Sequence, residues 1–215
     1  MKNSKLLISL LIICFLCTII SILFYVNQHK ITNTLIEKEV FKIREENLNL
    51  SKGLEPNYSI DEVESVTLES FIKHKNEFKK AKPKSRIEIP SIGLSLPIFA
   101  GINQTHLLMG AGEQIKDMEV GKYGNYILAA HRMPYTSGLG FNRIEKMEPG
   151  DLIYIYKDNV EYVYETNLIE EVSESDTQYL EDSSNEKLLT LYTCKEISVN
   201  SGNTNKIVVQ AKLVE

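Results

Sequence analysis

The chain has 215 residues, of which 43% are apolar and 25% are charged, and its formal net charge is −5. This composition is that of a globular protein and excludes a chain that is mostly disordered. The first 30 residues contain three basic residues and no acidic one, so residues 31–215 hold 21 basic and 29 acidic side chains. That acidic balance excludes a strongly basic nucleic-acid binder, which would need a surplus of Lys and Arg to contact phosphates.

The three cysteines exclude a disulfide scaffold. Cys14 and Cys17 lie in the apolar N-terminal run, and Cys194 is the only thiol in the polar part of the chain. A single thiol has no partner within its own domain.

Residues 6–26 form a run of 21 residues without a charge, between Lys2 and Lys5 on one side and His29 and Lys30 on the other. A helix of this length spans a hydrocarbon layer of roughly 30 Å. A cleaved signal peptide would have a shorter apolar region that ends in small residues, whereas this run ends in Tyr-Val-Asn-Gln. We therefore expect an uncleaved signal anchor over residues 1–30, a single span of the cell membrane, and an extracytoplasmic remainder.

Residues 31–84 are predicted to form a helical stalk and linker. A partial stripe of apolar residues predicts a polar helix over 33–50, which Gly53 and Pro56 would end. A second helix is expected over 62–78, with His74 as a solvated residue, followed by a lysine-rich linker over 79–84. We expect segment 54–82 to pack on the following domain and to shield its site.

From residue 85 onward the apolar pattern changes to that of short strands. Strands are expected over 86–90, 94–99, 125–130, 151–157, 160–172, 188–193 and 207–213, with small helices over 104–109 and 141–147. The Gly110-Ala111-Gly112 segment is interpreted as a turn. Short strands separated by turns predict an all-β barrel or sandwich.

Cys194 follows the apolar run 188–193 and is the candidate nucleophile. Most free cysteines are small buried hydrophobes, but a thiol at the end of a strand in an oxidising environment favours a chemical role. Such a thiol needs a base, and only His106 and His131 lie in the strand-rich region. His106 fits a structural role in its small helix. His131 ends the run 126–130, so two strands could bring His131 and Cys194 together.

These motifs resemble a known family. Thr190-Leu191-Tyr192-Thr193-Cys194 matches a T-L-x-T-C signature, Ala129-Ala130-His131 matches the histidine strand, and residues 89–98 match the first two strands. Over residues 85–214 the chain is similar to a sortase, the membrane-anchored cysteine transpeptidase of Gram-positive bacteria.

The resemblance implies an eight-stranded barrel as the catalytic domain, residues 85–215, without a cofactor. Cys194 would attack the Thr–Gly bond of an LPXTG-like sorting signal on a surface protein and form a thioester. His131 would protonate the leaving amine and then deprotonate the amine of a peptidoglycan precursor. Ala129 and Thr193 would lie in the substrate-binding part of the site. The partners would be LPXTG-type surface proteins, the precursor amine and the membrane, with no nucleic acid.

One position departs from the family. The family has an arginine at the start of the last strand, and this chain has Lys206 there. A lysine supplies charge without the planar fork of a guanidinium. We expect Lys206 to take this role. Arg132 ranks below it, because adjacent strand residues point to opposite faces, and Arg143 is a more distant candidate. The sequence does not settle the choice among the three.

Class A fits best within the family, because a class C enzyme would show a second span and a lid motif before the barrel. The calcium-binding variant uses an acidic cluster, of which Glu113, Asp117 and Glu119 are a thin version, so no metal is expected. Asp176 is given a structural role. Two other readings remain open: a hydrolytic cysteine peptidase and a non-catalytic membrane-tethered binding domain.

Overall fold

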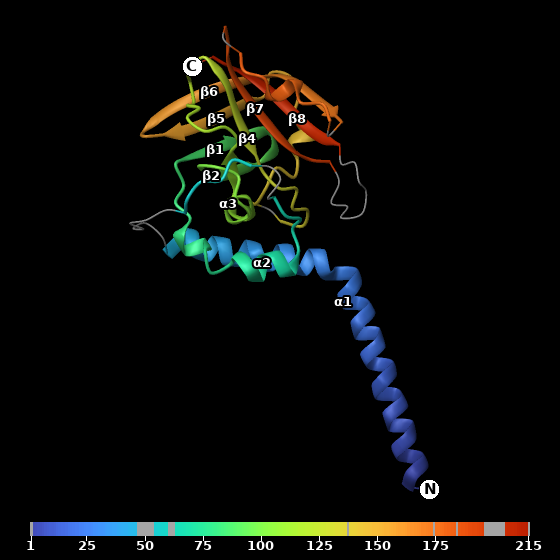
Figure 1. The fold of residues 1–215 in the computed structure, drawn as a ribbon. Coiled ribbons are helices and arrows are strands. Elements are labelled where there is room, and N and C mark those ends of the chain that lie inside the picture. The colour runs from blue at the N-terminus through green and yellow to red at the C-terminus, as the bar shows by residue number, and fades with distance from the viewer. Residues whose placement is uncertain are drawn as a thin grey trace.

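The structure is a computed structural model that describes residues 2–46, 54–59, 63–136, 138–173, 175–183, 185–195 and 205–214. A long helix leads to a closed barrel of strands (Figure 1). The barrel confirms the predicted eight-stranded fold. Its strands are β1 (Ser85–Ile89), β2 (Leu94–Phe99), β3 (Ala111–Glu113), β4 (Gly124–Ala129), β5 (Leu152–Lys157), β6 (Val160–Val172), β7 (Lys187–Cys194) and β8 (Lys206–Leu213).

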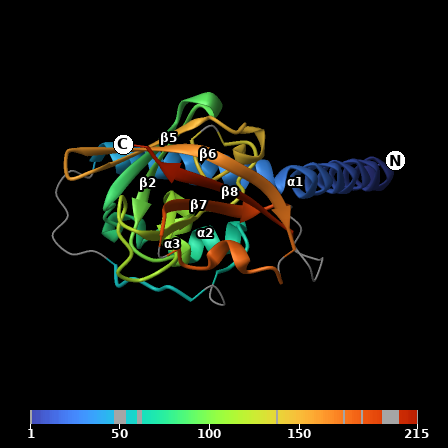
Figure 2. The ribbon, with the colours of Figure 1, turned by 90° about the horizontal axis from the view of Figure 1, so that it is seen from above.

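The strands close in the order β1-β2-β3-β4-β7-β8-β6-β5. Two neighbouring pairs, β2 with β3 and β4 with β7, are parallel, and the other pairs are antiparallel. Figure 2 shows β6, β8 and β7 side by side on one wall of the barrel. Because β4 and β7 are parallel, their carboxyl ends lie at the same end of the barrel, and the antiparallel β8 begins there.

Alternating side chains along the strands divide the barrel into an interior and an outer face. Ile87, Leu128, Tyr164 and Leu191 are among the buried side chains of the interior. On the outer face of β4 and β7, a second buried cluster joins strand residues to Ile102 and to Leu107 of helix α3 (Gln104–Met109). Helix α3 is thereby fixed against the outside of β4.

The structure corrects the interpretation of Gly110-Ala111-Gly112 as a turn, because residues 111–113 form β3. A Cβ on Gly110 would lie 2.4 Å from the Pro97 carbonyl oxygen, and a Cβ on Gly112 would lie 2.4 Å from that of Gly101. These glycines therefore allow other backbone segments to pack closely against β3. In a sequence, glycines that serve such packing cannot be distinguished from glycines that form a turn.

The predicted helix over 62–78 is shorter in the structure and is broken in two: α2 (Leu68–His74) and the 3₁₀ helix η2 (Phe78–Lys80). Thr67 begins α2, because its hydroxyl accepts a hydrogen bond from the Ser70 N–H at 3.0 Å in a capping box. The helix expected over 141–147 is a single 3₁₀ turn, η4 (Ile144–Lys146). The described residues also contain the 3₁₀ turns η3 (Pro90–Ile92) and η5 (Gln178–Leu180).

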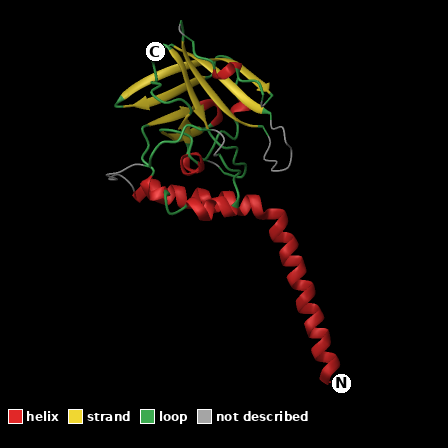
Figure 3. Cartoon of the chain, viewed as in Figure 1, coloured by secondary structure: helices red, strands yellow, loops and turns green. Residues whose placement is uncertain are grey.

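The apolar run and the stalk form one continuous helix, α1 (Lys2–Glu46). Its N-terminal part extends away from the barrel, and its C-terminal part lies beneath the barrel alongside α2 (Figures 1 and 3). By length and composition α1 can cross a membrane. The expected end of the stalk at Gly53 lies outside the described residues.

The C-terminal part of α1 is packed on the domain and does not stand free as a stalk. Ile36 and Val40 are fully buried in a cluster that contains Phe71 of α2 and Phe78 of η2. Farther along the chain, the Ile102 N–H donates to the Asn57 carbonyl at 2.6 Å. Parts of the segment 31–82 thus pack against the barrel domain. The division into segments 1–30, 31–84 and 85–215 stays a prediction.

His74 is not the solvated residue that the sequence predicts. Its side chain is largely buried, and its Nδ1 lies 3.4 Å from a Glu77 carboxylate oxygen and 3.4 Å from the Thr105 hydroxyl. The short helix α2 places His74 against α3, which a reading of local periodicity could not reveal.

Candidate active site

Three neighbouring strands bring the predicted site residues together. In the parallel pair β4–β7, Ala129 is opposite Tyr192, and the Ala130 N–H donates to the Tyr192 carbonyl at 3.3 Å. Two residues farther along each strand, this register leads to His131 and Cys194. In the antiparallel pair β7–β8, Cys194 is opposite Lys206. The end of β7 therefore lies between the end of β4 and the start of β8.

Lys206 is the cation that contacts the cysteine. Its Nζ lies 3.6 Å from the Cys194 Sγ and donates a hydrogen bond to it. Lys206 is only 7% exposed, so bulk water screens its charge weakly. Cys194 is partly exposed, whereas its neighbour Thr193 is buried. An incoming group can therefore reach the thiol beside a fixed positive charge.

The imidazole of His131 is partly buried and lies within electrostatic reach of Lys206. Two causes lower the pKa of His131 to about 4: burial is the larger, and the positive charge of Lys206 is the smaller. The ring is consequently neutral at neutral pH and able to accept a proton. Its Nε2 lies 3.1 Å from the Gln104 Oε1.

The backbone after His131 folds back on it. The Phe141 N–H donates to the His131 carbonyl at 3.0 Å. Gly140, at φ +68°, makes this approach possible, because a Cβ there would lie 2.1 Å from the same carbonyl oxygen. Loop 132–141 thus fixes the backbone of His131.

The two predicted substrate-binding residues have buried side chains. Thr193 donates a hydrogen bond from its hydroxyl to the Ala130 carbonyl at 2.9 Å and so links β7 to the end of β4. Ala129 packs in the cluster on the outer face of the barrel. Neither side chain offers a polar group to solvent.

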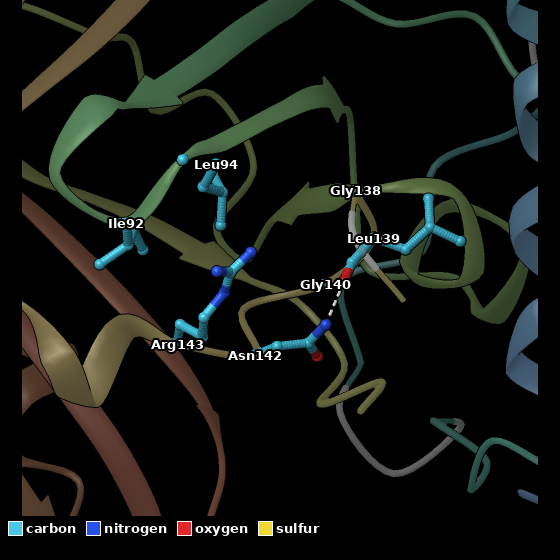
Figure 4. A pocket seen from close by; sticks show the side chains of 8 residues that line it. Ile92, Leu94, Gly138, Leu139, Gly140, Asn142 and Arg143 are labelled. Atoms are coloured by element: carbon cyan, nitrogen blue, oxygen red, sulfur yellow. Dashed lines mark hydrogen bonds between the residues drawn. The ribbon is translucent and has the colours of Figure 1, made fainter. Parts of the chain in front are cut away.

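The alternative cations lie elsewhere. Arg132 forms a two-bond ion pair with Glu145, with Nη2–Oε1 and Nη1–Oε2 distances of 2.7 and 3.3 Å. Arg143 lines a small cavity with Ile92, Leu94 and the loop 138–142, as Figure 4 shows; there the Asn142 Nδ2 donates to the Leu139 carbonyl at 2.8 Å. Among the residues that the structure describes, only Lys206 of the three contacts Cys194.

The acidic residues considered for calcium have other contacts. Glu113 is buried and accepts hydrogen bonds from the Lys84 Nζ and the Tyr126 hydroxyl, each at 2.8 Å. Asp117 has a left-handed backbone, with φ 64°. No group of three or more His, Cys, Asp or Glu side chains able to hold a metal occurs within the described ranges. Asp176 accepts a hydrogen bond from the Gln178 N–H at 3.1 Å, a local contact at the start of η5.

Sequence reasoning missed Gln104, the residue that contacts the His131 ring. The one available signal was a polar residue at the start of a small helix, which is ordinarily solvated. His106, two residues later, is buried and stacks on Phe99 with ring centroids 4.8 Å apart.

The sortase domain family matches residues 87–214, more than half of the chain, and the chain belongs to this family of cysteine transpeptidases. Sortase A of Bacillus anthracis is 36% identical over 129 residues, which cover 60% of this chain and 59% of that protein. Sortase A of Streptococcus agalactiae is 25% identical over 178 residues, which cover 81% and 70%. The curated sortases A thus match over 59–70% of their own lengths.

Solved structures of more than one sortase class share the fold. Sortase A of Listeria monocytogenes superposes with a TM-score of 0.56 at 29% identity, covering 62% of this chain and 88% of that one. The Clostridium perfringens sortase D5 transpeptidase has the same TM-score at 26% identity and covers 84% and 99%. The family is therefore established, while these superpositions do not separate class A from class D.

Proposed function

We propose that the chain is a class A sortase. It cleaves an LPXTG-like sorting signal between Thr and Gly and joins the surface protein to an amine of a peptidoglycan precursor. The observation that carries the proposal is the position of the Cys194 thiol. Its Sγ lies 3.6 Å from the Lys206 Nζ, and Cys194 ends β7 beside the end of β4, the strand that leads to His131. The curated relatives named Sortase A support the choice of class.

The reaction has two acyl-transfer steps. The proton of the Cys194 thiol passes to His131, and Sγ attacks the Thr carbonyl carbon to give a tetrahedral intermediate. The C–N bond to glycine breaks, and the imidazolium returns its proton to the departing amine, which leaves a thioester on Cys194. The precursor amine then attacks the thioester, His131 takes its proton, and the thiol is regenerated.

Lys206 takes the place of the family's arginine. A neutral His131 with a pKa of about 4 is a weak acceptor for a thiol proton, so the thiolate needs a second source of stabilisation. The buried ammonium at 3.6 Å from Sγ supplies it. A single ammonium lacks the two parallel donors of a guanidinium, and one preorganised donor is worth roughly 3 kcal/mol to a transition state.

Ala129 and Thr193 serve the site through the backbone of β4 and β7, since their side chains are buried. Thr193 holds the ends of the two strands together through Ala130. The N-terminal part of α1 spans the cell membrane, with the barrel outside the cytoplasm. Support for the membrane span comes from the apolar side chains of residues 6–26, nearly all of which are exposed, whereas Ile36 and Val40 are buried on the domain.

Intact mass measurement after incubation with an LPXTG-type peptide tests the proposal. The full chain should gain the mass of the acyl fragment, Cys194→Ala should gain nothing, and the fold of that variant should be unchanged. The matched control is the double variant Cys14→Ala/Cys17→Ala, which removes two thiols from α1 and should still be acylated.

An added amine distinguishes the reaction types. Formation of a ligated peptide identifies a transpeptidase, and release of the free acid alone identifies a hydrolytic peptidase. Absence of any adduct on the wild-type chain, across a panel of sorting-signal peptides, contradicts the proposed chemistry and leaves a binding domain.

A further inference from the structure

We propose that Gln104 is a positioning residue for His131, whose side-chain carbonyl keeps the His131 proton on Nε2 and leaves Nδ1 to exchange protons in the reaction. This inference rests on the proposed role of His131 as the acid and base of the site.

The contact joins two buried elements. Gln104 is the first residue of α3 and is only 3% exposed, and its Oε1 lies 3.1 Å from the His131 Nε2. The buried cluster that includes Leu107 fixes α3 on the outer face of β4. The amide therefore approaches the histidine from a rigid support, and little of its rotational freedom remains to be lost when the hydrogen bond forms.

A third group sets the direction of the hydrogen bond. The backbone N–H of Glu64 donates to the same Gln104 Oε1 at 3.2 Å. If the amide were turned by 180°, its NH₂ group would face this N–H, and two donors would meet. Glu64 thus fixes the oxygen toward His131. Because a carbonyl oxygen only accepts hydrogen bonds, the His131 Nε2 must carry the proton.

The other end of the amide argues against a purely structural role. The Gln104 Nε2 is buried and has no hydrogen-bond partner among the described residues. A buried amide that is satisfied at one end only is less favourable for folding than an apolar side chain of the same shape. A role in positioning His131 accounts for a buried amide that is unfavourable for folding.

The tautomer decides which nitrogen does the chemistry. With Nε2–H held by Gln104, the lone pair of the neutral ring is on Nδ1. The thiol proton then adds to Nδ1, and the same proton leaves from Nδ1 to the amine, while Nε2–H···Oε1 persists throughout. Fixing the tautomer in advance removes one reorganisation from each proton transfer.

The experiment uses the full chain in detergent micelles with ¹⁵N-labelled histidine. Ring ¹⁵N shifts at neutral pH report which nitrogen carries the proton, and a His131→Gln variant assigns the signals. We expect the Nε2–H form for His131 in the wild-type chain. This measurement needs neither substrate nor turnover, so it gives an answer even if the proposed reaction is wrong.

Two variants at position 104 separate the acceptor from the shape. Gln104→Met has a similar shape and no acceptor, and we expect a mixture of His131 tautomers and a fall in kcat of about 10- to 100-fold, the range of outer-shell partners, with little change in KM. Gln104→Glu keeps an acceptor for both Glu64 and His131 and should retain the Nε2–H form. The control Asn103→Ala removes a neighbouring amide that donates to the Glu55 carbonyl at 2.7 Å, and it should leave both the tautomer and kcat unchanged.

Two results would overturn the inference: a wild-type His131 protonated on Nδ1, or a Gln104→Met variant with the wild-type tautomer and kcat. If instead Cys194→Ala still forms an acyl adduct, the proposed function fails, and the tautomer measurement still decides the role of Gln104.

Discussion

Replacing Lys206 by methionine removes the charge beside the thiol and keeps most of the side-chain volume. A unit charge 3.6 Å from a thiolate is worth about 5 kcal/mol at an effective dielectric constant of 20. Desolvation of the buried ammonium offsets part of this attraction. A net loss of about 2–3 kcal/mol corresponds to a fall of about 30- to 160-fold in the rate of reactions that proceed through the thiolate.

Alkylation by iodoacetamide at pH 7, followed by intact mass, measures this loss without a substrate, because only the thiolate reacts. The assay uses the Cys14→Ala/Cys17→Ala background, so that Cys194 is the only thiol. Lys195→Met is the matched control, since Lys195 follows Cys194 in the chain but pairs with Glu171, and its rate should be unchanged. Lys206→Arg should stay close to the wild-type rate. A Lys206→Met chain alkylated as fast as the wild type would refute the electrostatic reasoning.

Three further variants test the packing. Burial lowers the pKa of His106 to about 4. The unfolded chain therefore binds a proton on the His106 ring more tightly than the folded chain does. As a result, the free energy of unfolding falls as the pH drops from about 6.5 toward 4. His106→Phe should remove about 2–3 kcal/mol of the difference in urea stability between pH 7.5 and 4.5, measured by pulse proteolysis; an unchanged difference contradicts this. Glu113→Ala removes the carboxylate acceptor of the buried Tyr126 hydroxyl and should cost about 3 kcal/mol by the same measurement, whereas a loss under 1 kcal/mol would contradict the buried network. Val40→Ala should cost about 1–3 kcal/mol if α1 packs as described, and a neutral result would mean that it does not.

The fold was largely predictable because short apolar runs bounded by turn residues mark most of the strands. Strands β2 and β6 have the predicted bounds, and the ends of β4 and β7 differ from the prediction by one residue. Strand β3 was missed because three residues, Ala-Gly-Glu, are too few to show a period of two. Its identity depends on backbone pairing with β2 and β4, and this pairing is a tertiary property.

The reacting residues of the site were more predictable than the residues that position them. Cys194 and His131 each follow an apolar strand, and a parallel register accounts for their proximity. The sequence favoured Lys206 over Arg132 only because adjacent strand residues point to opposite faces. It could not settle the choice, which depends on the antiparallel register of β8 and on Glu145, which pairs with Arg132. Gln104 contacts His131 across 27 positions of the chain, and no local pattern contains that information.

The packing also changes how the N-terminal segment can be studied. The shielding hypothesis predicted that deleting residues 54–82 raises turnover on a soluble peptide. In the structure the deletion would remove Phe71 and Phe78 from the core and the Glu64 N–H from Gln104. Loss of stability and loss of site geometry would both lower the rate, so a deletion of this segment does not isolate an effect of shielding.

The anchor helix and the site are joined through the loop after His131. The Asn33 Nδ2 of α1 donates to the Pro134 carbonyl at 2.6 Å, and the Glu37 Oε1 accepts the Gly138 N–H at 3.1 Å. The same loop holds the His131 carbonyl through Phe141. The packed part of α1, which lies beyond the bend that separates it from the apolar part (Figure 1), therefore also orients the backbone of His131. This support for the site comes from side-chain contacts across about 100 residues, which the catalytic motifs alone do not encode.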